Sequence, residues 1–315
     1  MKKDVISFVT TVFNEEKHLS AFLDSILSQT VMPDEIIIVD GGSTDSTLKI
    51  LNNYQKKFEI IKVHVVPGCK ISEGRNFGVK KSIGNIIFTA DSGTLFERRW
   101  VSKLMNGFEN ADVVFGKYAP KPKSLLEKFL VSRLPNWDKV NENKFLPSNR
   151  QCAFRKIVWE NVGGWPNFIK RADDNWFHEK AHSLKFRYKF VKDAEVYWKY
   201  ERNLKSLLKL SFLDSKSEGF AHLFIGRKIY FAEFFLLAVI MFLIATGILV
   251  NIKILLYGLI LGILGDILLG GLIPYRKTGN IEVFFMGILL TPLIYFAHVF
   301  GVLAGIFQRA WRRSE

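Results

Sequence analysis

Residues 36–45 read IIIVDGGSTD, and this stretch decides the fold class. Its four apolar residues predict a buried strand that ends on the carboxylate of Asp40 and opens into a Gly-Gly turn. Open α/β sheets bind ligands beyond the carboxyl ends of their strands, so Asp40 is placed at such an edge. The two glycines allow backbone angles and close approaches that a side chain would forbid. Polar residues suited to cap the next helix come next, Ser43 and Asp45.

The first 200 residues alternate between expected strands and helices with short connections. Apolar runs of short period predict strands, and apolar residues spaced by three and four predict helices. Strands are expected at 5–12, 35–39, 60–66, 86–90, 112–116, 186–190 and 194–199, and helices from about 14 and at 46–57, 73–82 and 98–107. This alternation predicts an α/β fold with a mostly parallel sheet covered by helices on both faces.

Charge and hydropathy are divided unevenly along the chain. The formal net charge is +14, whereas residues 229–307 carry few charges and long apolar runs. A basic surface suits nucleic acid, anionic lipid or a phosphorylated substrate. Because an apolar block is attached, lipid headgroups and phosphates are the expected partners and nucleic acid is not.

Three stretches of the apolar block are long enough to span a bilayer: 229–250, 252–274 and 281–307. A basic segment before them has leucines on one helical face, which predicts either an interfacial helix or a packing helix of the soluble part. A helix is also expected near 125–130, and it is either a core helix or one that rests on a membrane. The expected divisions are a soluble α/β domain at 1–203, an amphipathic region at 204–228, a transmembrane region at 229–308 and a basic tail at 309–315.

The cysteines and the N-terminus bear on location. Cys69 and Cys152 make no disulfide framework, although a bond between them stays open, and so few thiols suggest a reducing compartment. The apolar run at 5–13 is broken by polar residues, so it is expected to be a strand and not a secretory signal. We therefore expect a multi-pass protein of the cell membrane whose N-terminal domain lies in the cytoplasm.

Three segments together resemble a known family: TTVFNEE at 10–16, the stretch 36–45, and GRNFG at 74–78. Their order and spacing resemble the N-terminal half of the family-2 glycosyltransferases, which have the GT-A fold. The resemblance covers about residues 1–200. A catalytic domain followed by a few spans is also similar to the polyprenyl-phosphate sugar synthases of that family.

The resemblance implies where a nucleotide sugar would bind. Thr11, Asn14 and Glu15 would line the nucleotide pocket, and Asp40 would accept a hydrogen bond from the base. Arg75 would bind the diphosphate, because a planar guanidinium can bind it through two hydrogen bonds. The alternatives are a helix-capping acid at Asp40 and a surface arginine at Arg75.

Asp91 ends another apolar strand and occupies the place of the family's Asp-x-Asp motif. In the family the second acid ligates Mg²⁺ or Mn²⁺, which bridges the diphosphate and neutralises it as it departs. Gly93 stands where that acid is expected. A metal on Asp91 is nevertheless the expectation, held through waters or with help from Glu97. The alternative is that cationic side chains replace the metal.

The segment SNRQCAFR at 148–155 and the later Gly-Gly-Trp resemble the acceptor side of the family. The resemblance makes Asp174 the general base, which removes a proton from the acceptor hydroxyl as it attacks the anomeric carbon. The alternative is that the two acids of this segment only cap a helix. Expected acceptor-binding residues are Asn149, Arg150, Asp173 and Arg202.

A rival class comes from HEKAH at 178–182, which matches H-E-x-x-H. On a helix this spacing puts His178 and His182 on one face for zinc, with Glu179 as the base of a membrane peptidase. No third ligand suggests itself, and the motif falls in a helix that the transferase interpretation already predicts.

The resemblance thus implies an inverting glycosyltransferase that moves a sugar from a UDP- or GDP-linked donor to a membrane lipid-linked acceptor. Polysaccharide synthesis is the near alternative. The Gln-x-x-Arg-Trp motif of processive synthases is not evident after Asp174, so one sugar per encounter is expected. A third class, a binding protein with an inactive transferase fold, is kept open by Gly93. The sequence does not specify the base, the sugar or the oligomeric state.

Overall fold

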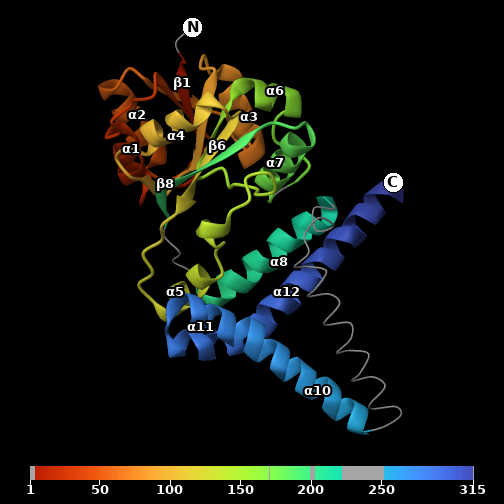
Figure 1. Ribbon diagram of the computed structural model, residues 1–315. Helices are drawn as coiled ribbons and strands as arrows, with labels where there is room; N and C mark the ends of the chain where they lie inside the picture. Colours follow the sequence, from red (N-terminus) through yellow and green to blue (C-terminus); the bar gives the residue numbers. More distant parts are fainter. Residues whose placement is uncertain (1–3, 170, 199–202, 222–251, 315) are drawn as a thin grey trace. The chain divides into compact units, whose positions relative to one another are not determined.

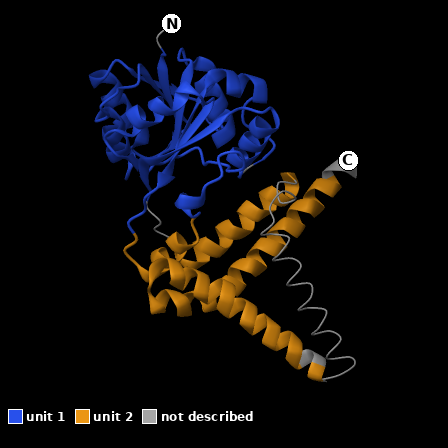
Figure 2. Cartoon of the chain, viewed as in Figure 1, with its two compact units in different colours: residues 1–121, 135–199 blue, residues 122–134, 200–315 orange. Residues whose placement is uncertain are grey.

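The computed structural model describes residues 4–169, 171–198, 203–221 and 252–314 (Figure 1). The chain divides into two compact units (Figure 2). Unit 1 comprises residues 1–121 and 135–199, and unit 2 comprises residues 122–134 and 200–315. The segment 122–134 therefore belongs with the C-terminal helices, although its position in the chain suggested the soluble domain.

Unit 1 is built on one eight-stranded sheet in the order β3-β2-β1-β4-β7-β6-β8-β5. The pairs β3–β2, β2–β1 and β1–β4 are parallel, as predicted, and β6–β8 is also parallel. The remaining pairs are antiparallel, so the sheet is mixed. The strands are β1 Ile6–Val12, β2 Glu35–Asp40, β3 Ile61–Val65, β4 Ile86–Asp91, β5 Thr94–Phe96, β6 Val113–Tyr118, β7 Cys152–Arg155 and β8 Tyr188–Trp198.

Helices cover both faces of this sheet, as the sequence predicts (Figure 1). One core contains Phe22 of α1 and Trp100 of α4, and the other contains Val79 of α3 and Phe177 of α7. The helices of unit 1 are α1 Leu19–Leu27, α2 Thr47–Lys57, α3 Ile71–Lys81, α4 Trp100–Asn106, α6 Lys156–Val162 and α7 Asp173–Ser183, with short 3-10 turns η1 Gly107–Glu109 and η2 Trp137–Lys139.

Glycines let α3 approach the sheet closely. A Cβ at Gly74 would lie 2.7 Å from Thr11 Cγ2, and one at Gly78 would lie 2.5 Å from Val9 Cγ1. Real Cβ atoms are not found so close to a neighbour, so larger residues here would push the helix away from β1. The GRNFG segment therefore presses α3 onto the end of β1, and this contact positions Arg75.

Three expectations about elements were wrong in detail. The first helix begins at Leu19 and not at Asn14, whose backbone is left-handed with φ 53°. The strands expected at 186–190 and 194–199 are one strand, β8, because it pairs first with β6 and then with β5. A register shift in β6 between Phe115 and Lys117 accommodates this continuous pairing. The short strand β5 was not predicted.

Unit 2 is helical. Its elements are α5 Leu125–Ser132, α8 Leu204–Ala221, α10 Ile252–Asp266, the π-helical turn η4 Ile267–Leu272, α11 Ile273–Thr278 and α12 Ile281–Ser314. Phe129 and Leu130 of α5 pack with Leu207 of α8 and with Val283 and Ile294 of α12. The helix near 125–130 is therefore a core helix of unit 2.

Helix α8 packs along α12 within unit 2. A Cβ at Gly305 of α12 would overlap the carbonyl oxygen of Lys216, so the two backbones come close together. By its contacts the helix belongs to unit 2, with the other C-terminal helices.

Two helical stretches of the described chain are long and apolar enough to cross a membrane: Leu256–Thr278 and Ile281–Trp311. They coincide with two of the three expected spans. The second runs as one helix through Pro292, without a break. The expected span at 229–250 lies outside the described residues.

Candidate active site

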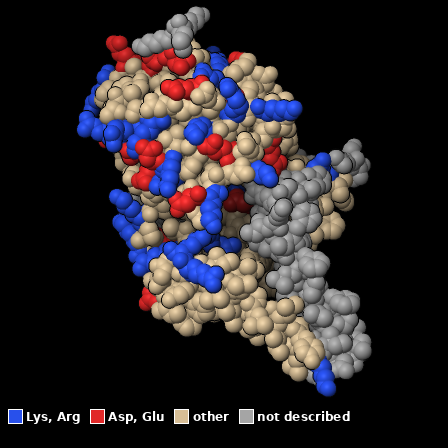
Figure 3. Space-filling view, in the orientation of Figure 1, with Lys and Arg blue, Asp and Glu red and all other residues tan. Residues whose placement is uncertain are grey.

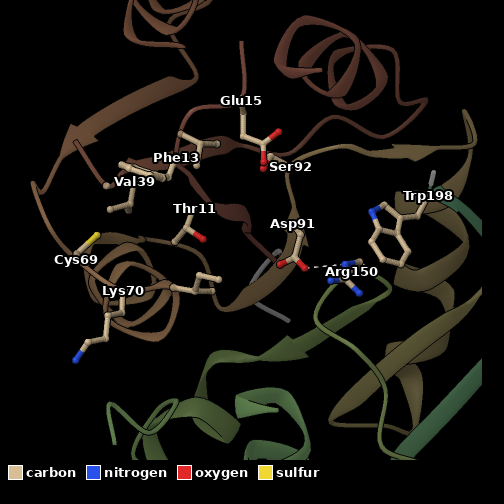
Figure 4. A pocket seen from close by; sticks show the side chains of 13 residues that line it. Thr11, Phe13, Glu15, Val39, Cys69, Lys70, Asp91, Ser92, Arg150 and Trp198 are labelled. Atoms are coloured by element: carbon tan, nitrogen blue, oxygen red, sulfur yellow. Dashed lines mark ion pairs between the residues drawn. The ribbon is translucent and has the colours of Figure 1, made fainter. Parts of the chain in front are cut away.

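A cavity of about 710 Å³ lies at the carboxyl ends of β1, β2 and β4 in unit 1 (Figure 4). Residues from the ends of these strands, from the start of α3 and from the end of β8 surround it. This is the edge at which Asp40 and Asp91 were predicted to present a ligand site. The lining residues are Thr11, Val12, Phe13, Glu15, Val39, Gly41, Cys69, Lys70, Ile71, Asp91, Ser92, Arg150 and Trp198.

Two residues predicted for the nucleotide pocket do line the cavity, Thr11 and Glu15, while Asn14 does not. Instead, Asn14 joins the loops that come after β1 and β2. Its Oδ1 accepts a 2.8 Å hydrogen bond from the backbone N–H of Thr44, and its own N–H donates to Ser43 Oγ at 2.9 Å. Asn14 therefore holds the wall of the cavity in place.

Asp40 is fully buried at the end of β2. Its Oδ1 accepts hydrogen bonds of 2.8 Å from the backbone N–H groups of Gly42 and Ser43, and its Oδ2 accepts a 2.6 Å bond from Ser43 Oγ. Ser43 thus serves this turn and does not cap α2. The predicted hydrogen bond from a base to Asp40 stays a prediction, since the turn occupies the carboxylate here.

Asp91 has a very different environment at the end of β4. Both of its carboxylate oxygens face guanidinium groups: Oδ1 pairs with Arg75 Nη2, and Oδ2 lies 2.7 Å from Arg150 Nε. These cations hold the pKa of Asp91 below its ordinary value, against the opposing effect of burial. The ring of Trp198 lies 4.3 Å from the Arg150 guanidinium and stacks with it (Figure 4).

Arg75 links this carboxylate to the predicted acceptor side. Its Nη1 donates a 2.6 Å hydrogen bond to Asp173 Oδ2, which also accepts a 3.2 Å bond from Ser72 Oγ. The side chain of Arg75 is 5% exposed, so it is a buried cation shared by two acids. The alternative of a surface arginine is wrong.

Asp174 is the second residue of α7, directly after Asp173. Burial, followed by the negative charge of Asp173, raises the pKa of Asp174 to about 6. A carboxylate with such a pKa is ionised near neutral pH and is a better proton acceptor than an ordinary aspartate. Its backbone neighbour Asn175 donates a 2.9 Å hydrogen bond to Asp174 Oδ1.

The other residues predicted to bind the acceptor do not share one described environment. Asn149 is 2% exposed, and neither its Oδ1 nor its Nδ2 has a hydrogen-bond partner among the described residues. Arg150 was predicted to contact the acceptor but lines the cavity with Asp91. Arg202 lies outside the described residues.

The H-E-x-x-H motif has a structural role in α7. His178 is fully buried, with Nδ1 2.9 Å from the hydroxyl of Tyr188 and Nε2 3.9 Å from Cys152 Sγ. Burial, with a smaller contribution from His182, lowers the pKa of His178 to about 3. His182 Nε2 lies 2.9 Å from the carbonyl oxygen of Phe145. Each imidazole thus has its own protein partner, which argues against a zinc site.

The surroundings of Asp91 do not fit a divalent ion as the side chains are arranged. Among the described residues no group of three His, Cys, Asp or Glu side chains could hold a metal. The carboxylate of Glu97, considered as a helper, pairs with Lys103. Two guanidinium groups occupy Asp91 instead. The Mg²⁺ or Mn²⁺ predicted from the resemblance stays a prediction, and this arrangement of side chains does not support it.

Sequence reasoning missed several lining residues, of which Trp198 is the clearest. It reaches the cavity because β8 pairs with β5 at Thr94–Trp198, a contact between residues far apart in the chain. Phe13 and Lys70 lie next to motifs that were recognised, so their proximity to those motifs was the available signal.

A cavity at the carboxyl ends of parallel strands, beside paired acids and guanidinium groups, places the chain among α/β proteins with a nucleotide-type site at the sheet edge. The sequence pattern of Glycosyl transferase family 2 matches residues 7–177. The chain belongs to this family.

Two curated relatives are similar to part of this chain. The poly(ribitol-phosphate) beta-glucosyltransferase of Bacillus spizizenii is 30% identical over 212 residues, which cover 63% of this chain and 32% of the relative. The poly(ribitol-phosphate) beta-N-acetylglucosaminyltransferase TarP of Staphylococcus aureus is 29% identical over 209 residues, covering 60% of this chain and 62% of the relative. The chain thus spans less than two thirds of either relative.

The fold is also shared with solved structures. The mannosyltransferase PcManGT from Pyrobaculum calidifontis, in complex with GDP-Man and Mn²⁺, aligns with a TM-score of 0.59. The alignment covers 99% of this chain and 88% of that one at 15% identity. At this identity the likeness shows the fold alone, which is the GT-A fold.

Proposed function

We propose that the chain transfers a sugar from a nucleotide diphosphate sugar, with inversion at the anomeric carbon. One observation carries this proposal: Arg75 joins Asp91, at the cavity, to the Asp173–Asp174 pair. Asp91, the carboxylate proposed to lie near the sugar donor, and Asp174, the carboxylate proposed to act as the base, therefore belong to one charged cluster. This is the arrangement needed when a leaving diphosphate and an attacking hydroxyl meet at one carbon.

The reaction assigns a proton and an electron pair to definite groups. Asp174 accepts the proton of the acceptor hydroxyl, and the hydroxyl oxygen forms a new bond to the anomeric carbon. The bond between that carbon and the diphosphate oxygen breaks, and its electron pair leaves with the diphosphate. Attack from the face opposite the leaving group inverts the configuration.

The cavity supports the donor part of the proposal. Thr11 and Glu15 line it together with the half-exposed ring of Phe13, so polar and aromatic groups are available to a nucleoside. Asp40 contributes by holding the turn after β2. Either a UDP- or a GDP-linked sugar is compatible with these residues.

For the acceptor we propose a membrane lipid-linked molecule. The two helical stretches able to cross a membrane support this proposal, because they would hold a cytoplasmic catalytic domain at the bilayer surface. The same proposal includes the divisions expected from the sequence: a catalytic domain that ends at residue 203, an amphipathic region that ends at 228 and a transmembrane region that ends at 308.

A second acceptor class is favoured by the relatives. Both curated relatives are named for poly(ribitol-phosphate), a phosphate-containing polymer. The alternative is therefore transfer to such a polysaccharide or polymer, again one sugar at a time.

The first experiment tests the transferase chemistry. UDP- and GDP-sugars are screened by thermal shift, and transfer and donor hydrolysis are then measured with the sugar that binds. Asp174→Asn should retain nucleotide binding and lose transfer. An unchanged transfer rate in this variant removes Asp174 from the role of base.

The second experiment separates the acceptors. Membranes and purified polymer are offered in turn with labelled donor, and the label is partitioned between organic and aqueous phases. Label in the organic phase supports the lipid-linked acceptor, and label on soluble polymer supports the alternative. Long products made from donor alone contradict the transfer of one sugar per encounter.

A further inference from the structure

The position of the missing second acid is open in this structure. Gly93 has φ +84°, and a Cβ built there would have no neighbour within 4 Å. A second carboxylate is therefore absent because of the residue type and not because the space is filled. Glu97, the acid considered as a helper, pairs with Lys103.

A cation lines the cavity next to Asp91. The Arg150 side chain lines the cavity, is 28% exposed and lies against Asp91 through Nε. A guanidinium has five N–H donors, so the same group can hold Asp91 and also meet phosphate oxygens. Trp198 stacks on Arg150 and limits its movement. Arg75 lies deeper, between Asp91 and Asp173.

The two guanidinium groups lie among three carboxylates. Arg75 pairs with Asp91 and Asp173, Arg150 pairs with Asp91, and Asp174 interacts electrostatically with both arginines. Of the two cations, Arg150 lines the cavity, where its guanidinium provides positive charge and hydrogen-bond donors for a diphosphate.

We propose that Arg150, held by Asp91 and Trp198 and supported by Arg75, binds the donor diphosphate in place of a divalent metal. The inference rests on the proposed function, because it concerns the donor of the same reaction. As the bond to the anomeric carbon breaks, negative charge grows on the leaving oxygen, and the Arg150 guanidinium stabilises that charge. Arg150 is thus a residue of the donor site and not of the acceptor site.

The first test measures nucleotide binding with and without metal. Binding of UDP and GDP to the full chain is measured by calorimetry in EDTA and again with Mn²⁺. We expect one of them to bind with an affinity that changes by less than about threefold between the two conditions. Binding only in the presence of Mn²⁺ overturns the inference and leaves the proposed function standing, whereas no binding in either condition contradicts both.

The second test removes the cation. Arg150→Gln should weaken binding of the nucleoside diphosphate by about tenfold to a hundredfold, as expected for a lost hydrogen bond to a charged group. Binding of the corresponding nucleoside, which has no phosphate, should be unchanged. Arg187→Gln is the matched control, because Arg187 is exposed and pairs with Asp112 away from the cavity. Equal losses for nucleoside and diphosphate contradict a phosphate contact.

The third test restores the family's acid. Gly93→Asp places a carboxylate in open space at a backbone angle that Asp and Asn tolerate better than most residues. This variant should acquire Mn²⁺ binding, detected by the spectroscopic signal of bound Mn²⁺, with a nucleotide affinity that now depends on the ion. Gly93→Asn has the same backbone cost without the charge and should not. Tight Mn²⁺ binding by the unaltered chain would falsify the inference.

Discussion

Asp40 and Asp91 each end an apolar strand, β2 and β4, on the two sides of β1, yet they lie in opposite environments. Asp40 is fully buried, and its oxygens accept hydrogen bonds from its own turn. The side chain of Asp91 is 26% exposed, lines the cavity and pairs with Arg75 and Arg150. An acid at the end of a strand can therefore either hold the neighbouring turn together or face the cavity at the sheet edge. On the face drawn in Figure 3, Lys and Arg side chains are interspersed with Asp and Glu side chains over unit 1.

The difference arises from the segment that comes after each strand. After β2 the chain turns through two glycines, so backbone N–H groups fold back onto Asp40. After β4 no such groups reach Asp91 among the described residues, and side chains from α3 and from the segment before β7 meet it instead. Local contacts therefore satisfy one acid and distant contacts satisfy the other.

The largest expected effect is on activity at Asp91. Asp91→Asn removes the charge that holds both arginines in place, and we expect kcat/KM to fall by about a hundredfold, or about 3 kcal/mol of transition-state stabilisation. Thermal unfolding should change little by comparison. Both kcat/KM and Tm are measured for this variant. A large loss of Tm with normal activity would mean that Asp91 stabilises the fold and does not act in the reaction.

The expected effect of Asp40→Asn is on stability. The amide cannot accept three hydrogen bonds as the carboxylate does, so the free energy of unfolding should fall by about 1–3 kcal/mol. Denaturant unfolding measures this change. If the variant unfolds normally and instead loses affinity for the nucleotide, Asp40 contacts the base directly.

The pH dependence of the transfer rate tests the role of Asp174 as the base. Burial and Asp173 raise the pKa of Asp174 to about 6, and only its deprotonated form accepts a proton. Transfer should therefore fall about tenfold for each pH unit below that pKa. This fall in rate with decreasing pH should be absent from the residual activity of Asp174→Asn. A profile that stays flat down to about one pH unit below this value contradicts the raised pKa.

The smallest effect is expected at Asn14. Asn14→Ala removes the acceptor for the Thr44 N–H, and an exposed hydrogen bond of this kind contributes about 0.5–1.5 kcal/mol. We expect a small loss of stability and a modest rise in KM for the donor, because the cavity wall loosens. A change in kcat as large as that of Asp91→Asn would instead give Asn14 a direct role.

Much of the parallel half of unit 1 could be predicted from the sequence. The strands β1 to β4 and the helices between them are set by short-range apolar periodicity and glycine turns, which act over a few residues. The antiparallel half was harder, because β5 is short and β8 depends on two different partners. The left-handed backbone of Asn14 was missed, since a local pattern does not show that the loop pairs with Ser43 and Thr44.

The candidate site shows the same division. The sequence determined the residue types that chemistry requires, including the two strand-end acids, the acid pair at the start of α7 and the glycine in place of a second acid. Only the tertiary structure decided that Arg75 joins Asp91 to Asp173, and that Arg150 and Trp198 reach the cavity. The physical reason is range: periodicity and turn chemistry act between neighbours, whereas a charge finds its partner across the sheet only after the chain has folded.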